Sequence, residues 1–392
     1  MKKKIKIFIL VGEDSGDFIA SQLIKGFSIK KVKNIEFHGV TGQRMKKLNV
    51  KSVFDFQQIN VIGFKEILLN FFVIKKKINF LSDYIINLHP DIVITIDAKV
   101  FSLNLANSLK KRFHEKKIRI PLIHFVPPTI WAHSPQRARK WNGLHDKLIS
   151  LIPNEKEFFK KFSIDTTYIG NPIFENLITK IINTNNKTNN MKKKICLILP
   201  GSRNKEILHN IDTLLKSIKL INYKYPSIDW YLPSTKSFKF MIKNKLKEFN
   251  LEKKVKIIDF NKDFSKIINA KVAIACSGTV TLELALAGIP TIGVYKTDWL
   301  NGIIAKFIVN KENVILPNFI VGKEIIPFLF QEKCNPENIY SIFQDFYNRN
   351  KFYKKKFTNF SEMLVNKMDH NTEYKTGTFA KNAAVEILSL IK

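Results

Sequence analysis

A strand–turn–helix pattern in the second half of the chain constrains the fold most. An apolar run at residues 272–275 leads to the small residues Ser277 and Gly278, and a helical pattern follows from Thr279 to residue 287. The start of such a helix has free backbone N–H groups and a positive dipole end, which suit a phosphate. Glu283 lies one turn further on the same face, where a carboxylate can accept hydrogen bonds from a ribose. An ordinary capped junction with a surface glutamate is the alternative.

The same pattern occurs a second time. Residues 195–199 form an apolar run, the turn Gly201, Ser202 and Arg203 follows, and a long helical pattern begins near Glu206. Arginine pairs bidentately with phosphate and keeps its charge. Two such turns in one half of a chain predict one anion held from two sides, such as the diphosphate of a nucleotide-sugar. Neither turn has the Gly-Lys-Ser/Thr of a Walker loop or the glycine spacing of a dinucleotide fingerprint.

Strand and helix patterns alternate along the whole chain, which predicts parallel sheets covered on both faces. The expected strands lie at residues 5–11, 35–40, 92–96, 122–126, 147–151, 195–199, 229–232, 255–258, 272–275 and 291–294. The expected helices outside the two turns lie near residues 18–27, 101–116, 155–162 and 378–391. Residues 178–194 read as a polar linker.

We therefore expect an α/β fold of two Rossmann-like domains, with parallel sheets facing a central cleft. The first domain would span residues 1–177, completed by a C-terminal helix at about 370–392, and the second residues 195–369.

The charge of the chain is its most unusual bulk property. The formal net charge is +32 over 392 residues, which predicts anionic partners: nucleic acid, an acidic membrane face or phosphorylated substrates. The chain is also rich in Lys, Asn, Ile and Phe, as coding bias toward A and T produces, so charge alone does not indicate nucleic-acid binding. Three widely spaced cysteines, Cys196, Cys276 and Cys334, exclude a disulfide framework or a zinc ribbon and suit a reducing cytosol.

The N-terminal segment looks like a signal peptide at first. Its lysines precede an apolar run, but Lys6 interrupts that run, and Glu13 and Asp14 follow it without a small-residue cleavage site. The segment is therefore expected to be a first strand. No apolar run in the sequence approaches the length that crosses a bilayer.

Polar residues follow two expected strands of the first half. Glu13, Ser15, Gly16 and Asp17 come directly after the first strand, where they could hold sugar hydroxyls or cap the next helix. Asp97 ends the strand at residues 92–96. A carboxylate at that end of a core strand faces the predicted cleft and suits a general base, although capping of the next helix explains it too.

Taken together, these motifs resemble those of the lipid-A-disaccharide synthase family, which has the GT-B glycosyltransferase fold, and the resemblance covers nearly the whole chain. The matching positions include Gly12 to Asp17, Gly39, Gly42, Met45, Gly63 to Leu68, Asp91 to Ala98, His124, Pro128, Trp131, Leu199 to Arg203, Glu206, Ser277 to Thr279, Leu282, Glu283, Pro290, Tyr295, Lys296, Leu316 to Asn318, Pro327 and Gln331. Single motifs are weak signals, but their order and spacing together are specific.

The resemblance implies an inverting, metal-independent glycosyl transfer without a cofactor, at the cytosolic face of a Gram-negative inner membrane. The donor would be UDP-2,3-diacylglucosamine, the acceptor 2,3-diacylglucosamine 1-phosphate, and the product a β-1,6 disaccharide 1-phosphate. Asp97 would be the catalytic base. The implied substrate-binding residues are Glu13, Ser15, Gly16, Asp17, Gly201, Ser202, Arg203, Glu206, Ser277, Gly278, Thr279, Glu283, Asn318 and Gln331.

Departures from the family pattern cluster in the first half, where the acceptor should bind. Lys99 and Val100 replace the usual Pro-Asp/Glu, Ser134 follows His133 in place of Trp-Arg, and Asn171 replaces a histidine. These departures keep other functions open: another GT-B enzyme acting on a UDP-sugar, such as an epimerase or an N-acetylglucosaminyl transferase, an inactive homologue, or a non-catalytic basic protein that binds membrane or nucleic acid. We expect no nucleic-acid partner, and the sequence leaves the oligomeric state open.

Residues 61–80 are dense in large apolar side chains and carry the basic cluster Lys75, Lys76 and Lys77. This pattern predicts a segment that lies in the interface of an anionic membrane, with its lysines at the headgroups. A core helix with a solvated lysine end is the alternative.

Overall fold

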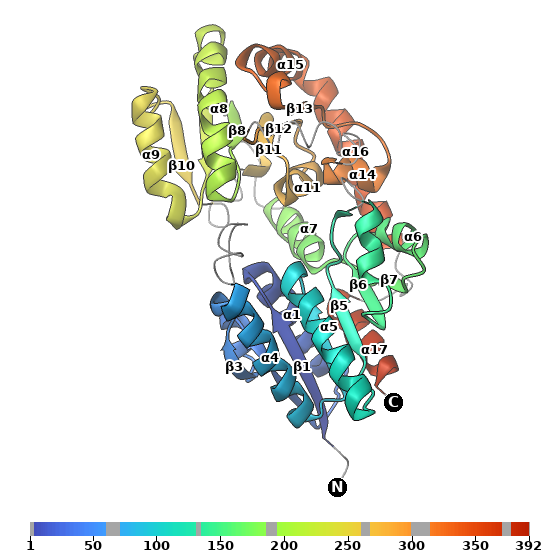
Figure 1. Ribbon diagram of the computed structural model, residues 1–392. Helices are drawn as coiled ribbons and strands as arrows, with labels where there is room; N and C mark the ends of the chain where they lie inside the picture. Colours follow the sequence, from blue (N-terminus) through green and yellow to red (C-terminus); the bar gives the residue numbers. More distant parts are fainter. Residues whose placement is uncertain are drawn as a thin grey trace. The chain divides into compact units, whose positions relative to one another are not determined.

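The computed structural model describes residues 4–59, 71–130, 135–185, 194–259, 267–298, 314–370 and 378–391. Contacts divide the chain into two compact units. The first unit takes in the chain up to residue 130, residues 135–175 and the C-terminal segment from residue 368, and the second unit takes in residues 176–367. Each unit is built on one parallel sheet (Figure 1), so the predicted α/β fold with two Rossmann-like domains is confirmed.

The sheet of the first unit has seven parallel strands in the order β3-β2-β1-β4-β5-β6-β7. Their bounds are β1 Ile5–Val11, β2 Ile35–Thr41, β3 Lys51–Asp55, β4 Ile92–Ile96, β5 Leu122–Phe125, β6 Lys147–Ser150 and β7 Thr166–Tyr168. The five strands predicted from the sequence are present. The two that the sequence did not predict, β3 and β7, are the edge strands, which are short or half-exposed and therefore lack a continuous apolar run.

Helices cover both faces of this sheet. Their bounds are α1 Asp14–Ile29, α2 Gln43–Lys46, α4 Phe71–Leu88, α5 Lys99–Lys116, α6 Glu155–Lys160 and α17 Phe379–Leu390. Figure 1 shows α4 and α5 side by side along the sheet, and these two helices are in contact. α1 packs against α17, and Gly26 permits the close approach, since a Cβ on it would lie 1.8 Å from the carbonyl oxygen of Ala380.

The C-terminal helix is tied into the first unit by hydrogen bonds to residues far away in sequence. The backbone N–H of Phe379 donates to Glu175 Oε1 (2.6 Å), and Asn382 Nδ2 donates to the carbonyl of Ile169 (2.9 Å). Lys147 Nζ pairs with Glu386 Oε1 at 2.7 Å. The end of the chain therefore completes the domain that the start of the chain begins.

The second unit contains six parallel strands in the order β10-β9-β8-β11-β12-β13. Their bounds are β8 Ile195–Leu199, β9 Asp229–Pro233, β10 Val255–Ile258, β11 Val272–Cys276, β12 Thr291–Tyr295 and β13 Phe328–Phe330. The helices are α8 Asn204–Lys224, α9 Lys239–Glu248, α11 Thr279–Leu286, α14 Leu316–Val321, α15 Pro336–Asn348 and α16 Asn350–His370. All five predicted strands of this half are present, and the three-residue edge strand β13 is the addition.

The predicted polar linker begins later than the sequence suggested. Helix α7 runs from Pro172 to Asn185, so residues 178–185 are helical. Phe174 and Leu177 are buried and Ile178 and Ile181 are half-buried, a helical spacing that the following asparagine-rich run obscured. The rest of the predicted linker, residues 186–193, lies outside the described residues.

Among the described residues, no helix is both long enough and apolar enough to cross a lipid bilayer.

Candidate active site

Asp97 sits in an unusual backbone conformation where β4 ends and α5 begins. Both Asp97 (φ 53°) and Ala98 (φ 46°) are in the left-handed region, which is rare for residues other than glycine. The N–H of Asp97 donates to the carbonyl of Phe125 (3.1 Å), and Ser102 Oγ donates to the carbonyl of Asp97 (2.8 Å). Such strain costs on the order of 1–3 kcal/mol per residue and persists where the surroundings hold it, which is typical of functional sites.

The environment of the Asp97 carboxyl group tunes its acidity. Burial raises the pKa of Asp97 to about 6, and a hydrogen bond with Glu13 raises it as well. The ammonium of Lys99, 3.7 Å from Asp97 Oδ1, acts in the opposite direction and lowers the pKa. The side chain remains 21% exposed, so a ligand can reach it. A carboxylate with a pKa just below neutrality suits a general base.

The loop after β1 lies next to Asp97. A Cβ on Gly12 would lie 2.3 Å from the Cβ of Ala98, so glycine is required for the ends of β1 and β4 to approach this closely. Ser15 Oγ donates to Glu13 Oε1 (2.6 Å). Glu13 and Ser15 are therefore brought together with Asp97 at one edge of the sheet, as the sequence analysis expected of strand-end loops.

Two residues predicted to bind substrate have structural roles in the fold. Gly16 is buried in α1, where an added Cβ would lie 3.3 Å from Val11 Cβ, so it serves the packing of helix on sheet. Asp17 is fully buried, and its carboxylate accepts hydrogen bonds from the backbone N–H groups of Gly42 (3.1 Å), Arg44 (2.8 Å) and Met45 (3.1 Å). Its carboxylate anchors the start of α2.

In the second unit, the turn after β8 is held from within. Ser202 N and Arg203 N donate to Glu206 Oε2 (3.1 and 3.3 Å), and Arg203 pairs with Glu206 Oε1 at 2.8 Å. Gly201 has φ 131°, and a Cβ there would lie 2.6 Å from Glu206 Cβ. Glu206 thus supports the turn, and its contact with the substrate stays a prediction. The side chain of Arg203 is 74% exposed and remains accessible to an anion.

The turn after β11 keeps its ligand-facing side open. Ser277 is anchored through its N–H to Val294 (2.9 Å) and through Oγ to the carbonyl of Val314 (3.2 Å). Apart from its two chain neighbours, no described residue has a heavy atom within 4 Å of a Cβ built on Gly278. Helix α11 starts at Thr279, and its first turn leaves backbone N–H groups without intrahelical partners. Open space beside a helix start is what a phosphate needs.

Glu283 has the properties expected of a ribose acceptor. Burial raises the pKa of Glu283 to about 7, and the nearby charge of Lys180 lowers it. Within the part of the chain that the structure describes, no hydrogen bond or ion pair engages its carboxylate. A half-buried carboxylate without a partner is costly, and hydroxyl donors of a ligand would offset that cost.

Asn318 and Gln331, both predicted near the donor, are committed to the backbone of the protein itself. Asn318 Oδ1 accepts from the N–H groups of Ile325 (3.2 Å) and Ile326 (3.1 Å), and its Nδ2 donates to the carbonyl of Ile326 (2.9 Å). Gln331 Oε1 accepts from Thr297 N (3.0 Å), and Nε2 donates to the carbonyl of Thr297 (3.3 Å). They hold the loops that follow α14 and β12, and their contact with the donor stays a prediction.

Sequence analysis missed Asn210, a fully buried residue of α8. Its Oδ1 accepts from Lys296 N (2.9 Å), and its Nδ2 donates to the carbonyl of Glu206 (2.7 Å). It therefore connects the helix after the arginine turn to the end of β12. The only sequence signal is its position one helical turn after Glu206.

A buried aromatic cluster beside β5 was also missed in part. His124 is fully buried, its Nδ1 lies 2.8 Å from Thr95 Oγ1, and its ring is 4.6 Å from that of Trp141. His145 stacks on Trp141 at 5.2 Å. Burial holds the pKa of His124 well below its usual range, so the ring is neutral and supports the end of β4 by packing. The family resemblance drew attention to His124 but not to Trp141 or His145.

Within the described ranges, no group of three or more His, Cys, Asp or Glu side chains is placed to hold a metal ion. The expectation of a metal-independent reaction stays a prediction.

Comparison with known proteins identifies the family. Residues 7–383 match the family model described as Lipid-A-disaccharide synthetase. The chain belongs to the lipid-A-disaccharide synthase family. The lipid-A-disaccharide synthase of Rickettsia canadensis (strain McKiel) is 32% identical, with 98% of this chain and 97% of that protein covered. Membership makes the chain a glycosyltransferase of lipid A biosynthesis, in agreement with the resemblance found in the sequence.

Solved structures with the same fold are more distant in sequence. UDP-GlcNAc 2-epimerase from Neisseria meningitidis, solved with UDP-GlcNAc bound, has a TM-score of 0.58 at 15% identity, covering 98% of this chain and 99% of that one. MurG of Acinetobacter baumannii has a TM-score of 0.56 at 14% identity, covering 99% of both chains. At these identities the likeness shows the fold alone, and that fold is GT-B.

Proposed function

We propose that this glycosyltransferase moves 2,3-diacylglucosamine from UDP-2,3-diacylglucosamine to 2,3-diacylglucosamine 1-phosphate. The products would be a β-1,6 disaccharide 1-phosphate and UDP. The observation that carries the proposal is Asp97, a strained, largely buried carboxyl group at the end of β4 with a pKa of about 6. Family membership supplies the substrate class.

Asp97 is the general base of the proposed reaction. Its carboxylate accepts the proton of the acceptor's 6-hydroxyl while that oxygen attacks the anomeric carbon of the donor, which inverts the configuration there. The bond from the anomeric carbon to the diphosphate oxygen breaks, and UDP leaves with the electron pair. Glu13 and Ser15, at the same edge of the sheet, are proposed to hold sugar hydroxyls.

The second unit is proposed to bind the donor nucleotide. The exposed guanidinium of Arg203 and the start of α11 at Thr279 would stabilise the negative charge that develops on the departing diphosphate. Arg203 and the start of α11 would stabilise that charge without a metal ion. Glu283 would accept hydrogen bonds from the ribose.

A second GT-B function, epimerisation of a UDP-sugar, shares the fold and the nucleotide-binding chemistry but needs no acceptor. One assay distinguishes the two. Purified protein is incubated with UDP-2,3-diacylglucosamine, with and without the lipid acceptor, and the products are identified by mass. We expect disaccharide and UDP only when the acceptor is present. UDP release that does not depend on the acceptor would contradict the proposal.

The same assay tests the base. Asp97→Asn should lower kcat by about 10²–10⁴-fold, the usual contribution of one general base, with little change in KM for the acceptor.

The same variant also changes stability. Because burial raises the pKa of Asp97 to about 6, keeping its carboxyl group ionised above that pH reduces the free energy of unfolding. The Asn variant removes that cost and should melt no lower than wild type at pH 8. Wild-type turnover by the variant would show that another group is the base.

We further propose that the enzyme binds the cytosolic face of the inner membrane peripherally, through the segment that leads into α4. Phe72 is 75% exposed, Val73 49% and Phe80 54%, so the start of α4 presents apolar side chains to solvent beside three lysines. Residues 61–70 of the predicted segment lie outside the described residues. The exposed phenylalanines support an interfacial role, and the buried side of α4 supports its packing on the sheet.

A further inference from the structure

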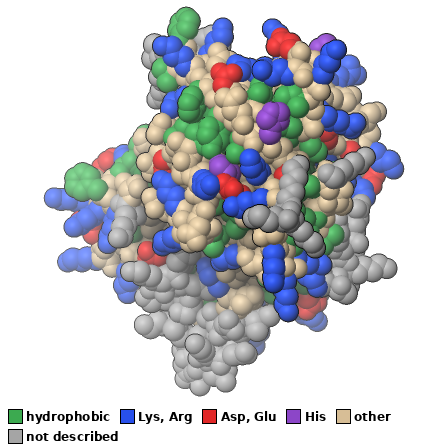
Figure 2. Space-filling model, turned by 90° about the horizontal axis from the view of Figure 1, so that it is seen from below, with side chains coloured by type: hydrophobic (Ala, Val, Ile, Leu, Met, Phe, Trp, Pro, Cys, Tyr) green, Lys and Arg blue, Asp and Glu red, His purple; other side chains and the backbone are tan. Residues whose placement is uncertain are grey.

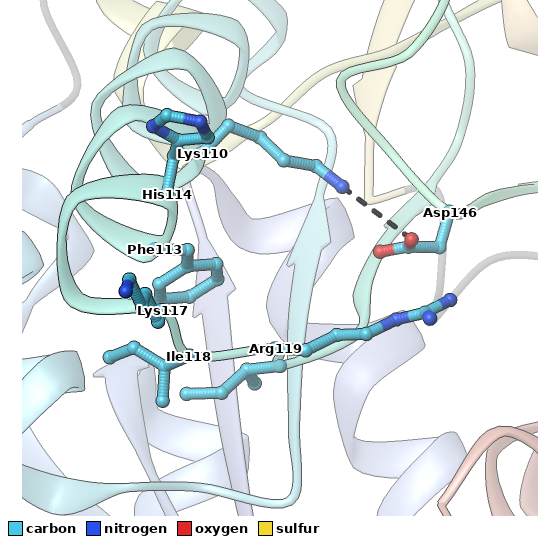
Figure 3. Close-up of a pocket in the computed structure, with 8 residues that line it drawn as sticks. Lys110, Phe113, His114, Lys117, Ile118, Arg119 and Asp146 are labelled. Carbon is cyan, nitrogen blue, oxygen red and sulfur yellow. Dashed lines mark hydrogen bonds and ion pairs between the residues drawn. The ribbon is translucent and has the colours of Figure 1, made fainter.

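A pocket of about 550 Å³ opens in the first unit where α5 ends and the chain turns toward β5 (Figure 3). Its floor is apolar, since Phe113 (5% exposed) and Ile120 (6% exposed) line it. Basic side chains surround the floor, among them Lys117 and Arg119. An apolar floor beneath a ring of cations is the chemistry of a site for an anionic ligand with an apolar body.

This pocket is separate from the proposed catalytic site. Helix α5 begins at Lys99, directly after Asp97, and the pocket is formed by its last two turns and the residues that follow. A helix of 18 residues is about 27 Å long, so the pocket and Asp97 lie at opposite ends of it. Figure 2 looks at the end of the molecule where α5 finishes, and Lys and Arg side chains are spread over that face with hydrophobic groups between them.

Two cations of the pocket are left without an anionic partner. Around it, Lys110 pairs with Asp146 (3.5 Å), Lys111 with Glu115 (4.0 Å) and Arg112 with Asp83. No ion pair within the described residues engages Lys117 or Arg119. Figure 3 shows Lys110 reaching toward Asp146 and Arg119 extending along the same side of the pocket. The positive charge of the wall is therefore not cancelled by the single carboxylate.

The backbone that carries these cations is well held. Lys117 adopts φ 53° as the residue that ends α5, its N–H donates to the carbonyl of His114 (3.2 Å), and the N–H of Ile118 donates to the carbonyl of Phe113 (3.0 Å). This closes the last turn and satisfies two of its carbonyl groups. The negative end of the helix is thereby partly neutralised, and the two free cations project from a fixed turn.

We propose that this pocket binds a phosphate group joined to an apolar body. The guanidinium of Arg119 would pair with two phosphate oxygens, and the apolar part would lie on Phe113 and Ile120. Lys117, which Figure 3 draws on the other side of Phe113 from that guanidinium, would add only longer-range attraction. Either the headgroup of an anionic phospholipid or a free phosphorylated metabolite supplies this chemistry. The proposal rests on the pocket alone and does not depend on which sugar the enzyme transfers.

The test compares two double variants with equal charge loss on the same stretch of chain. Lys117→Gln/Arg119→Gln removes the free cations of the pocket, and Lys111→Gln/Lys116→Gln removes two exposed charges outside it. Full-length proteins are titrated by calorimetry with monomeric dihexanoyl phosphatidic acid and with glycerol 3-phosphate. Sedimentation with phosphatidylcholine vesicles, with and without phosphatidylglycerol, is measured in parallel. Thermal melting checks that both variants are folded.

We expect the pocket variant to lose at least about fivefold in affinity, since one cation near an anionic group contributes about that much, while the control stays within about twofold of wild type. Loss of vesicle and phosphatidic acid binding with no effect on glycerol 3-phosphate assigns the pocket to a lipid headgroup. Loss of binding to glycerol 3-phosphate assigns it to a soluble phosphorylated compound. Equal losses in the two variants, or no binding of any probe by wild type, would overturn the proposal.

Discussion

Asp97 has two charged neighbours, Glu13 and Lys99, at the end of β4. Burial and Glu13 raise the pKa of Asp97, whereas Lys99 lowers it. Lys99 is also a position where this chain departs from the family pattern. The cation therefore keeps a buried base ionised at neutral pH, which links that departure to the acidity of the catalytic group.

Removing the positive charge of Lys99 and removing the negative charge of Glu13 should shift the pH profile of kcat in opposite directions. Wild-type kcat should rise with pH and level off above about pH 6, as Asp97 loses its proton. Lys99→Met removes the cation and should move this rise to higher pH, and Glu13→Gln removes an anion and should move it to lower pH. Profiles measured over pH 5–9 check both. If the two variants shift the same way, the titrating group is not Asp97.

Glu283 gives a binding prediction at the same scale. Glu283→Gln should weaken UDP binding by about 1–3 kcal/mol, because ribose hydroxyls lose a charged acceptor. Since the pKa of Glu283 is about 7, wild-type affinity should also fall as the pH drops through 7 and the carboxylate becomes protonated. UDP itself titrates, so the variant supplies the baseline: calorimetry at pH 6 and 8 should show a smaller pH dependence for Glu283→Gln. An equal pH dependence of UDP affinity in wild type and variant would mean that Glu283 does not bind the ribose.

At the scale of elements, patterns in the sequence predicted the strand–turn–helix units well, because buried parallel strands are continuous apolar runs. Strand β3 and the end of α7 were not predicted because their side chains are only partly buried, and β7 was not predicted because it has only three residues, two of them threonines. The roles of individual side chains were harder to predict from the sequence. Asp17, Asn318 and Gln331 bond to backbone groups in other elements, and only the folded structure brings those groups within reach.

One side of helix α4 packs in the core, and its start exposes apolar groups to solvent. Phe72→Ser/Val73→Ser changes exposed side chains and should reduce flotation with anionic vesicles while the protein stays folded. Leu81→Ser, at a fully buried position of the same helix, should lower the melting temperature instead. Flotation and melting curves of both variants check this. Undiminished flotation of the first variant would place membrane binding elsewhere.

Across the whole first unit, the contact between α1 and α17 joins the two ends of the chain. Gly26→Ala should destabilise this unit, because the new methyl group would collide with the carbonyl of Ala380. Alanine is otherwise the better helix former by about 1 kcal/mol, so a loss of stability is diagnostic. Gly278→Ala, where a Cβ meets open space, is the matched control for thermal unfolding. Unchanged melting of Gly26→Ala would mean that the helices separate at little cost.

The return of α17 also affects the order in which the protein is made. On the ribosome, residues 4–175 emerge before the second unit, but the helix that covers α1 and bonds to Ile169 and Glu175 is translated after it. The second unit is almost continuous in sequence, so it has all its strands before the first unit has its final helix. The nascent first domain thus exposes an apolar surface until α17 has been translated. A fragment of the first unit that lacks α17 would be expected to require chaperones, whereas residues 176–367 are nearly the whole second unit and suit expression as a separate domain.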